Sequence, residues 1–234
     1  MEGQAPSRLT FRARPPAGSA ERGGDLPLRL DAVRDGILYV PDTAEAAAPV
    51  MMFLHGAGGS GRRELRAVLG AADRYGVVIV APDSRSITWD VIEFGFGPDV
   101  QFIDRALDAV VDRCDVDPTR LALGGVSDGA TYALSLGLGN GDVFEALVAF
   151  SPGGMAPAEI VGRPRVYVSH GTADPVLPID TSSRALVPLL GDAGYDVTYH
   201  EFDGGHTVPA PVADEAFRWW LAPGAQPGPE RPAG

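Results

Sequence analysis

Short apolar runs alternate along this chain with longer segments in which apolar residues recur every three or four positions. A short run that is apolar at every position predicts a strand buried on both faces of a parallel sheet. Four such runs are Val50–Leu54, Val77–Val80, Leu121–Gly125 and Leu147–Phe150. Two further strands are expected at Arg165–Ser169 and Val197–Phe202.

The N-terminal part of the chain predicts an antiparallel edge to this sheet. Its expected strands are Leu9–Arg14, Leu26–Leu30 and Gly36–Val40. The pair Asp35-Gly36 separates the last two and is typical of a β-hairpin turn.

Helical spacing is clearest from Asp99 to Asp115, where one apolar stripe includes Val100, Ile103, Leu107, Val110, Val111 and Cys114. Other helices are expected at Arg62–Tyr75, Gly129–Leu138, Thr181–Ala193 and Pro211–Leu221. Strands and helices that alternate at this spacing predict a right-handed, doubly wound α/β sheet. Its active site should lie in loops beyond the carboxyl ends of the strands.

The long helix raises two questions of chemistry. Cys114 is the only cysteine, and its place on the apolar stripe predicts a packed, structural thiol. Asp104, Asp108 and Asp112 stand four apart on the opposite face, a spacing that a metal site could use. A solvated face with Arg105 and Arg113 nearby is sufficient to explain them, so no metal is expected.

Length and charge limit the class of protein. The 234 residues fit a single domain, expected over 1–222, followed by a Pro- and Gly-rich tail over 223–234 that is expected to be disordered. The formal charge of −12 argues against nucleic acid or an anionic membrane as a partner, because phosphate groups would be repelled. No run reaches membrane-spanning length, and the first twenty residues have no apolar run typical of a signal peptide. A cytoplasmic monomer or homodimer is expected.

The strongest chemical motif is Gly125-Val126-Ser127-Asp128-Gly129, which follows an expected strand and opens an expected helix. This context is typical of a nucleophile elbow, in which a sharp strand-to-helix turn exposes a serine hydroxyl above the sheet. Ser127 is therefore the candidate nucleophile.

A serine hydroxyl needs a base, and the base needs an orienting group. His206 lies in a glycine-rich loop just past the last expected strand, which makes it the best placed of the four histidines. Asp174 follows the strand Arg165–Ser169 and is the candidate acid, with Asp203 as the alternative. The chain order Ser127, Asp174, His206 matches the order of nucleophile, acid and base in this class of sheet.

The tetrahedral intermediate needs two backbone donors for its negative oxygen. The amide of Asp128 should supply one, because it follows the serine at a helix N-terminus. The glycine-rich turn after Val50–Leu54 should supply the other, from Ala57 or alternatively Gly58. His55 is expected to brace this turn. The turn could also cradle a phosphate, but no Lys-Ser/Thr pair follows it.

Together these motifs resemble the α/β-hydrolase superfamily, from about Val50 to Leu221. The chain is similar to small serine esterases grouped around polyhydroxybutyrate depolymerases, feruloyl esterases and the phospholipase/carboxylesterase type. The similarity rests on His55-Gly56-Ala57-Gly58-Gly59, on Gly125-Val126-Ser127-Asp128-Gly129, on the loop His170-Gly171-x-x-Asp174-x-x-x-Pro178, and on His206. It implies the α/β-hydrolase fold, with a mostly parallel central sheet of about eight strands and helices on both faces, and catalysis without a cofactor.

The chain departs from secreted depolymerases, which usually carry a leader, disulfides and a substrate-binding domain. An extracellular polymer is therefore not the expected substrate. The segment between Ser151 and Pro164 is also too short for a large lid.

The substrate pocket is harder to predict. Trp89 lies in a loop on the catalytic side, where it could stack on a flat acyl group or pack the loop onto the body. Met155, Val176, Leu177 and Val208 could form apolar walls. No basic cluster surrounds the motifs, so a strongly anionic acyl group is not expected.

The best supported function is a serine carboxylesterase (EC 3.1.1.-) that cleaves small esters with short-chain or aromatic acyl groups through an acyl-enzyme. A thioesterase, lysophospholipase or peptidase could use the same triad. A non-catalytic ligand-binding protein on a hydrolase fold is the alternative from another class. Loss of a triad member would be the signature of such a protein, and this chain keeps all three.

Overall fold

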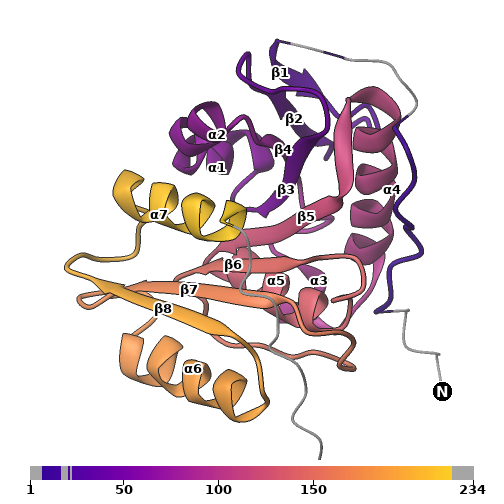
Figure 1. The fold of residues 1–234 in the computed structure, drawn as a ribbon. Helices are drawn as coiled ribbons and strands as arrows, with labels where there is room; N and C mark the ends of the chain where they lie inside the picture. Colours follow the sequence, from indigo (N-terminus) through magenta and orange to yellow (C-terminus); the bar gives the residue numbers. More distant parts are fainter. Residues whose placement is uncertain (1–6, 17–20, 22, 223–234) are drawn as a thin grey trace, which may run out of the picture.

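Eight strands form one sheet in the computed structural model, which describes residues 7–16, 21 and 23–222 (Figure 1). The strands are β1 (Gly24–Pro27), β2 (Gly36–Val40), β3 (Ala48–Leu54), β4 (Val78–Pro82), β5 (Val116–Val126), β6 (Ala146–Phe150), β7 (Arg165–Gly171) and β8 (Val197–Phe202). Their order across the sheet is β1-β2-β4-β3-β5-β6-β7-β8. The pairs β1–β2 and β2–β4 are antiparallel and all the others are parallel. The expected mostly parallel sheet of about eight strands is confirmed.

Helices cover both faces of the sheet. They are α1 (Gly61–Glu64), α2 (Leu69–Tyr75), α3 (Asp90–Glu93), α4 (Pro98–Arg113), α5 (Asp128–Leu138), α6 (Ser183–Asp192) and α7 (Ala210–Leu221). One core cluster joins the sheet to α4, α5 and α6, and the other joins it to α2 and α7. In Figure 1, α2 and α7 lie on the side of the sheet away from α4.

Alternation along β3 explains the two cores. Met52 and Leu54 belong to the cluster under α4 and α5, whereas Met51 and Phe53 belong to the cluster under α2 and α7. Every residue of this strand is buried. A strand with helices on both faces must be apolar at each position, which is why such runs predicted it.

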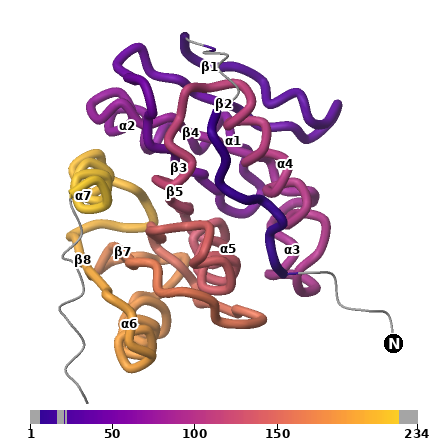
Figure 2. Tube along the Cα trace, turned by 45° about the vertical axis from the view of Figure 1, so that its right-hand side comes forward, coloured from indigo at the N-terminus to yellow at the C-terminus, as the bar shows by residue number. Residues whose placement is uncertain are grey.

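The expected strand Leu9–Arg14 is wrong. This segment runs alongside α4 as extended chain without joining the sheet (Figure 2). Two of its amides are satisfied by a side chain of α4 instead: those of Thr10 and Phe11 donate to the Asp104 carboxylate, at 3.0 and 2.7 Å. Sequence spacing alone cannot distinguish a strand from a segment whose amides a neighbouring helix satisfies.

The acidic face of α4 therefore holds the N-terminal segment. Arg14 lies 2.8 Å from Asp108 and 2.7 Å from Asp112. Across residues 7–16, 21 and 23–222, no cluster of three or more metal-ligating side chains occurs. Cys114 is 2% exposed at the end of α4, so the predicted packed thiol is confirmed.

The hairpin between β1 and β2 differs from the prediction in its turn. β1 ends at Pro27, and residues 28–35 form the connection, so Asp35-Gly36 is not a two-residue turn. The Asp35 carboxylate accepts hydrogen bonds from the amides of Arg29 and Leu30, both at 2.8 Å. Asp35 thus stabilises a long loop, because its side chain replaces the missing backbone partners.

Other boundaries shift for local reasons. The helix expected over Arg62–Tyr75 is divided into α1 and α2 by a 3₁₀ turn at Leu65–Ala67. The four residues of α3 are too few to produce a helical pattern. The single domain over 1–222 stays a prediction, and the tail at 223–234 lies outside the described residues. None of the helices in the described part of the chain is both long and apolar enough to cross a bilayer.

Candidate active site

Ser127 lies in a strained turn between β5 and α5, with φ of 57° and ψ of −122°. Non-glycine residues rarely adopt this conformation, and its cost of about 1–3 kcal/mol must be offset by the surrounding structure. The flanking glycines permit it. A Cβ atom on Gly125 would lie 2.5 Å from the carbonyl carbon of Gly129, and one on Gly129 would lie 2.2 Å from the Leu54 oxygen. The Gly-x-Ser-x-Gly pattern is thus a packing requirement of this turn.

The glycine-rich turn after β3 lies directly beside the serine. A Cβ atom on Gly56 would lie 3.3 Å from Ser127 Cβ. The Gly58 amide donates to the Ile87 carbonyl at 2.8 Å, so it is not available to a substrate. The Ala57 amide makes no hydrogen bond with any described residue. Of the two alternatives for this oxyanion donor, the geometry therefore favours Ala57 over Gly58.

Asp128 is the first residue of α5, where helix geometry leaves the amide without an intrahelical partner. Its side chain points elsewhere: the Thr88 hydroxyl donates to the Asp128 carboxylate at 2.6 Å. The Asp128 amide thus remains a candidate donor for a developing oxyanion.

His206 and Asp174 are paired. His206 Nδ1 donates to Asp174 Oδ2 at 2.6 Å, and the Asp174 side chain is fully buried while that of His206 is 19% exposed. Ser127 and His206 both line one cavity. Asp203, the alternative acid, is exposed and forms no hydrogen bond or ion pair with His206.

The Asp174 carboxylate is held in its ionised form. Burial opposes ionisation, but the amides of Leu177 and Val176 and the ring of His206 outweigh it and lower the pKa of Asp174. Both amides donate to Oδ1, at 2.9 and 2.8 Å, which leaves Oδ2 for the histidine. A carboxylate in this state can hold the imidazole in one tautomer and stabilise its positive charge.

The loops that carry Asp174 and His206 are joined to each other. The Ala173 amide donates to the Gly204 carbonyl at 2.9 Å. A Cβ atom on Gly171 would lie 2.4 Å from the carbonyl oxygens of Gly204 and Gly205, so only glycine permits this approach. The distance from acid to base is therefore set by backbone contacts.

Comparisons with known proteins place this geometry in context. No family model and no curated protein sequence matches the chain. Among solved structures, an esterase called PE8 is 26% identical, and the match covers 79% of this chain and 96% of that one, with a TM-score of 0.65. The Bacillus cereus carboxylesterase is 20% identical over 81% of this chain and 94% of its own, with a TM-score of 0.63. An S-formylglutathione hydrolase from Staphylococcus aureus is 14% identical over 84% and 98%, with a TM-score of 0.67.

The chain has the α/β-hydrolase fold. Its structural neighbours include carboxylesterases and serine hydrolases, which support the expected class, a serine ester hydrolase. The solved structures that are less than 25% identical to this chain support its fold and nothing further.

In this α/β-hydrolase, His55 braces the turn beside the serine, as expected. Its Nδ1 donates to the Gly56 carbonyl at 2.7 Å, and its Nε2 accepts from the Ser84 amide at 2.9 Å. Burial lowers the pKa of His55, so the ring stays neutral and structural.

Trp89 does not line the catalytic cavity, so the hypothesis that it stacks on substrate is wrong. The ring is 1% exposed, and its Nε1 donates to the His55 carbonyl at 2.8 Å. It packs between the rings of His55 and Tyr132, with centroids 4.9 and 5.1 Å away. The sequence placed this tryptophan in the right loop but could not show the direction of its side chain.

The cavity beside Ser127 has a volume of about 570 Å³. Val176 and Val208 contribute apolar wall, as predicted. Met155 and Leu177 do not line this cavity: Met155 packs on the core, and Leu177 lies against Gly153. No helix forms between β6 and β7 in the described chain.

One wall of the cavity is charged, which the sequence analysis missed. Arg63, Glu64 and Arg66 all line it, so the expectation that no basic cluster surrounds the motifs is wrong. Burial raises the pKa of Glu64, while Arg63, the Gly56 amide and His206 oppose that rise. The sequence predicted one continuous helix over Arg62–Tyr75. In the structure, the 3₁₀ turn at Leu65–Ala67 interrupts that helix within this charged segment.

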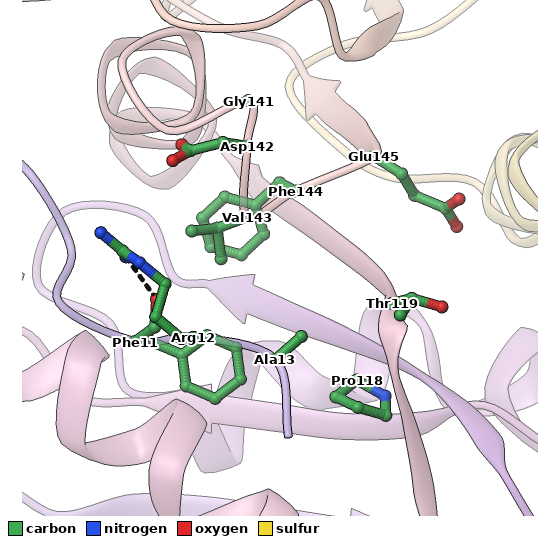
Figure 3. A pocket seen from close by; sticks show the side chains of 10 residues that line it. All are labelled: Phe11, Arg12, Ala13, Pro118, Thr119, Gly141, Asp142, Val143, Phe144 and Glu145. Carbon is green, nitrogen blue, oxygen red and sulfur yellow. Dashed lines mark hydrogen bonds between the residues drawn. The ribbon is translucent and has the colours of Figure 1, made fainter. Parts of the chain in front are cut away.

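A second hollow, of about 220 Å³, lies far from this chemistry (Figure 3). Phe11 and Arg12 form one side of it, and Pro118 and Thr119 form another, at the opposite end of β5 from Ser127. Neither Ser127 nor His206 lines this hollow. The cavity beside Ser127 is therefore the candidate active site.

Proposed function

We propose that this α/β-hydrolase is a serine carboxylesterase that acts on small esters with short-chain or aromatic acyl groups. The observation that carries the proposal is the 2.6 Å hydrogen bond between His206 and buried Asp174, with His206 and Ser127 lining one cavity. The strained backbone of Ser127 adds support, because strain of this kind occurs at functional sites.

The proposed reaction proceeds through an acyl-enzyme. Ser127 Oγ attacks the ester carbonyl while His206 Nε2 removes the hydroxyl proton, and Asp174 stabilises the imidazolium that forms. The Ala57 and Asp128 amides bind the oxygen of the tetrahedral intermediate, where each such donor contributes about 10²–10³ in rate. His206 then protonates the departing alcohol. Water then attacks the acyl carbonyl carbon while His206 accepts its proton, the bond from that carbon to Ser127 Oγ breaks, and His206 returns the proton to Oγ as the acid leaves.

The size of the cavity favours small substrates. Its volume is about 570 Å³, and small or short side chains such as Ala57, Ala67 and Val126 form much of its wall. A ligand site of this size typically encloses a compact molecule. Short-chain and single-ring acyl groups fit this space better than a long lipid chain.

The test compares wild type with Ser127→Ala on para-nitrophenyl esters from acetate to palmitate and on methyl ferulate. We expect serine-dependent hydrolysis that is fastest for the short or aromatic members, with Ser127→Ala at the background rate. Equal rates for both proteins would overturn the assignment of the nucleophile. A folded wild type that is silent on all esters but cleaves thioesters or peptides would overturn the substrate class.

Labelling with a fluorophosphonate separates an enzyme from a non-catalytic ligand-binding protein. We expect one label on wild type and none on Ser127→Ala. We also propose that the protein acts in the cytoplasm as a monomer or homodimer. Cell fractionation and size-exclusion chromatography with light scattering test these two points.

A further inference from the structure

Two arginines, Arg63 and Arg66, line the catalytic cavity. Arg63 and Arg66 are both exposed there, and their side chains make no hydrogen bond or ion pair with residues 7–16, 21 or 23–222. Their neighbour Arg62 differs, because it lies 2.7 Å from Asp25 and does not line the cavity. A free guanidinium fork at a cavity wall can bind a carboxylate through two parallel hydrogen bonds.

The rest of the protein makes this wall unusual. The chain has a formal charge of −12, so its overall field repels anions. Among the described residues, Glu64 is the only carboxylate that lines the cavity. The Glu64 side chain accepts a hydrogen bond from the Gly56 amide, and it interacts with Arg63 through charge without a close ion pair. Among the described residues that line the cavity, two arginine charges thus stand against one carboxylate.

Arg66 lies where the catalytic cavity meets a second hollow. It lines both the catalytic cavity and a groove of about 430 Å³ between α2 and α7, and Ala67 is also shared by the two. A substrate group that extends out of the cavity past Ala67 would meet the Arg66 side chain. The position suits recognition of a group at the end of a small ester, not the reacting bond itself.

We propose that Arg63 and Arg66 bind a carboxylate carried by the substrate, so that the preferred esters are anionic. The inference rests on the proposed esterase function and adds a substrate class to it. Neither arginine takes part in the bond-breaking steps. Both determine specificity, because they attract and orient the charged end while Ser127 attacks the ester.

The test uses matched ester pairs that differ only in charge. One pair places the carboxylate on the alcohol side: para-acetoxybenzoate against para-acetoxybenzamide. The other places it on the acyl side: monomethyl adipate against methyl adipamate. The measured quantity is the ratio of kcat/KM for the anionic member to that for the neutral member, at low and high salt. The proteins are wild type, Arg63→Gln, Arg66→Gln, the double variant, and Arg62→Gln as the matched control.

In at least one pair we expect wild type to prefer the anionic ester, with a ratio that falls as salt rises. The double variant should lower that ratio by about fivefold or more, mainly through KM, because exposed ion pairs have modest energies that add. Arg62→Gln should have the same ratio as wild type. The kcat/KM values for the neutral esters should be unchanged in the variants.

Equal ratios in wild type and the double variant would overturn the inference and leave the arginines as solvated surface charges. An equal fall in Arg62→Gln would also overturn it, because that result indicates a general field effect. If no member of either pair is cleaved, and the nitrophenyl series is silent too, the proposed function itself has failed. Hydrolysis of the neutral members keeps these two failures distinct.

Discussion

The Nε2 atom of His170 lies 3.2 Å from Asp174 Oδ2, the same oxygen that accepts the hydrogen bond from His206. His170 is fully buried at the end of β7, and its Nε2 also lies 2.8 Å from the Leu177 carbonyl. Because Nε2 faces two acceptors, it carries the proton, and Nδ1 accepts from the Ser183 hydroxyl at 2.7 Å. His170 therefore fixes both the carboxylate and the loop that carries it.

From this contact we predict that His170 is a positioning residue. His170→Ala should lower kcat by about tenfold or more with little change in KM, because small displacements of catalytic groups are costly. His200→Ala is the control, since His200 is part-exposed and contacts Glu215. Steady-state kinetics with circular dichroism as a check on folding decide the case. A kcat equal to that of wild type would show that the loop needs no such support.

The assignment of the acid gives a second prediction. Asp174→Asn should lower kcat by about 10⁴-fold, because the amide no longer holds the imidazole in the reactive tautomer. Asp203→Asn should leave kcat unchanged, since Asp203 is exposed and forms no hydrogen bond or ion pair with His206. The measurement is ester hydrolysis across pH 6–9 by both variants. A large loss of kcat in Asp203→Asn, with kcat unchanged in Asp174→Asn, would instead assign Asp203 as the acid that orients His206.

The glycines of the elbow give a third prediction. Gly129→Ala should destabilise the fold by about 3 kcal/mol or more, because its Cβ would lie 2.2 Å from the Leu54 oxygen. Helix propensity favours alanine by about 1 kcal/mol, which is too little to offset this overlap. Gly70→Ala is the control, since a Cβ at Gly70 in α2 meets nothing within 4 Å. In urea unfolding, Gly70→Ala should be at least as stable as wild type. Equal losses of unfolding free energy in Gly70→Ala and Gly129→Ala would contradict the packing argument.

Motifs set by local packing were predictable from the sequence. The turn at Ser127 requires small neighbours wherever it occurs, so Gly125 and Gly129 mark it. β8 begins and ends at the predicted residues, Val197 and Phe202, because the period of a strand and its turn residues are local properties too.

Features set by contacts distant in sequence were not predictable. Leu9–Arg14 has the composition of a strand, but the amides of Thr10 and Phe11 donate to the Asp104 carboxylate of α4 instead of to a neighbouring strand. Trp89 occupies the expected loop, yet its ring turns inward to the His55 carbonyl. Arg63 and Arg66 fall within the expected helix Arg62–Tyr75, and only the tertiary fold places them at the cavity. In each case the sequence gives the residue type and the fold decides the direction of the side chain.

The buried thiol gives a fourth prediction. Burial raises the pKa of Cys114 to about 11, and the side chain is 2% exposed. The reactive thiolate is therefore scarce and inaccessible at pH 8. We expect native protein to react with a disulfide reagent far more slowly than protein in urea. Native protein treated with the reagent should lose no esterase activity. Rapid labelling of the native protein would contradict the packed position of Cys114.

Asp99, at the start of α4, gives a prediction about pH. It is 1% exposed, and its carboxylate accepts the amides of Arg85 and Asp90, at 2.6 and 2.8 Å. Burial raises its pKa from 3.8 to about 6, and the nearby charge of Asp90 adds to the rise, despite these hydrogen bonds. The folded protein thus holds this proton more tightly than the unfolded chain does.

The sign of the effect follows from linkage. Between pH 4 and 6 the folded state binds more protons at this site than the unfolded state, so its contribution to stability is full below about pH 4 and is lost as pH rises through 6. The loss is on the order of 2–3 kcal/mol. Other carboxylates titrate in this range with the opposite sign, so the measured quantity is the difference in unfolding free energy between wild type and Asp99→Asn at each pH. We expect wild type to become less stable relative to the variant as pH rises from 4 to about 7, with no further change to pH 8. A difference that is constant across this range would show that Asp99 ionises in the folded protein as it does in the unfolded chain.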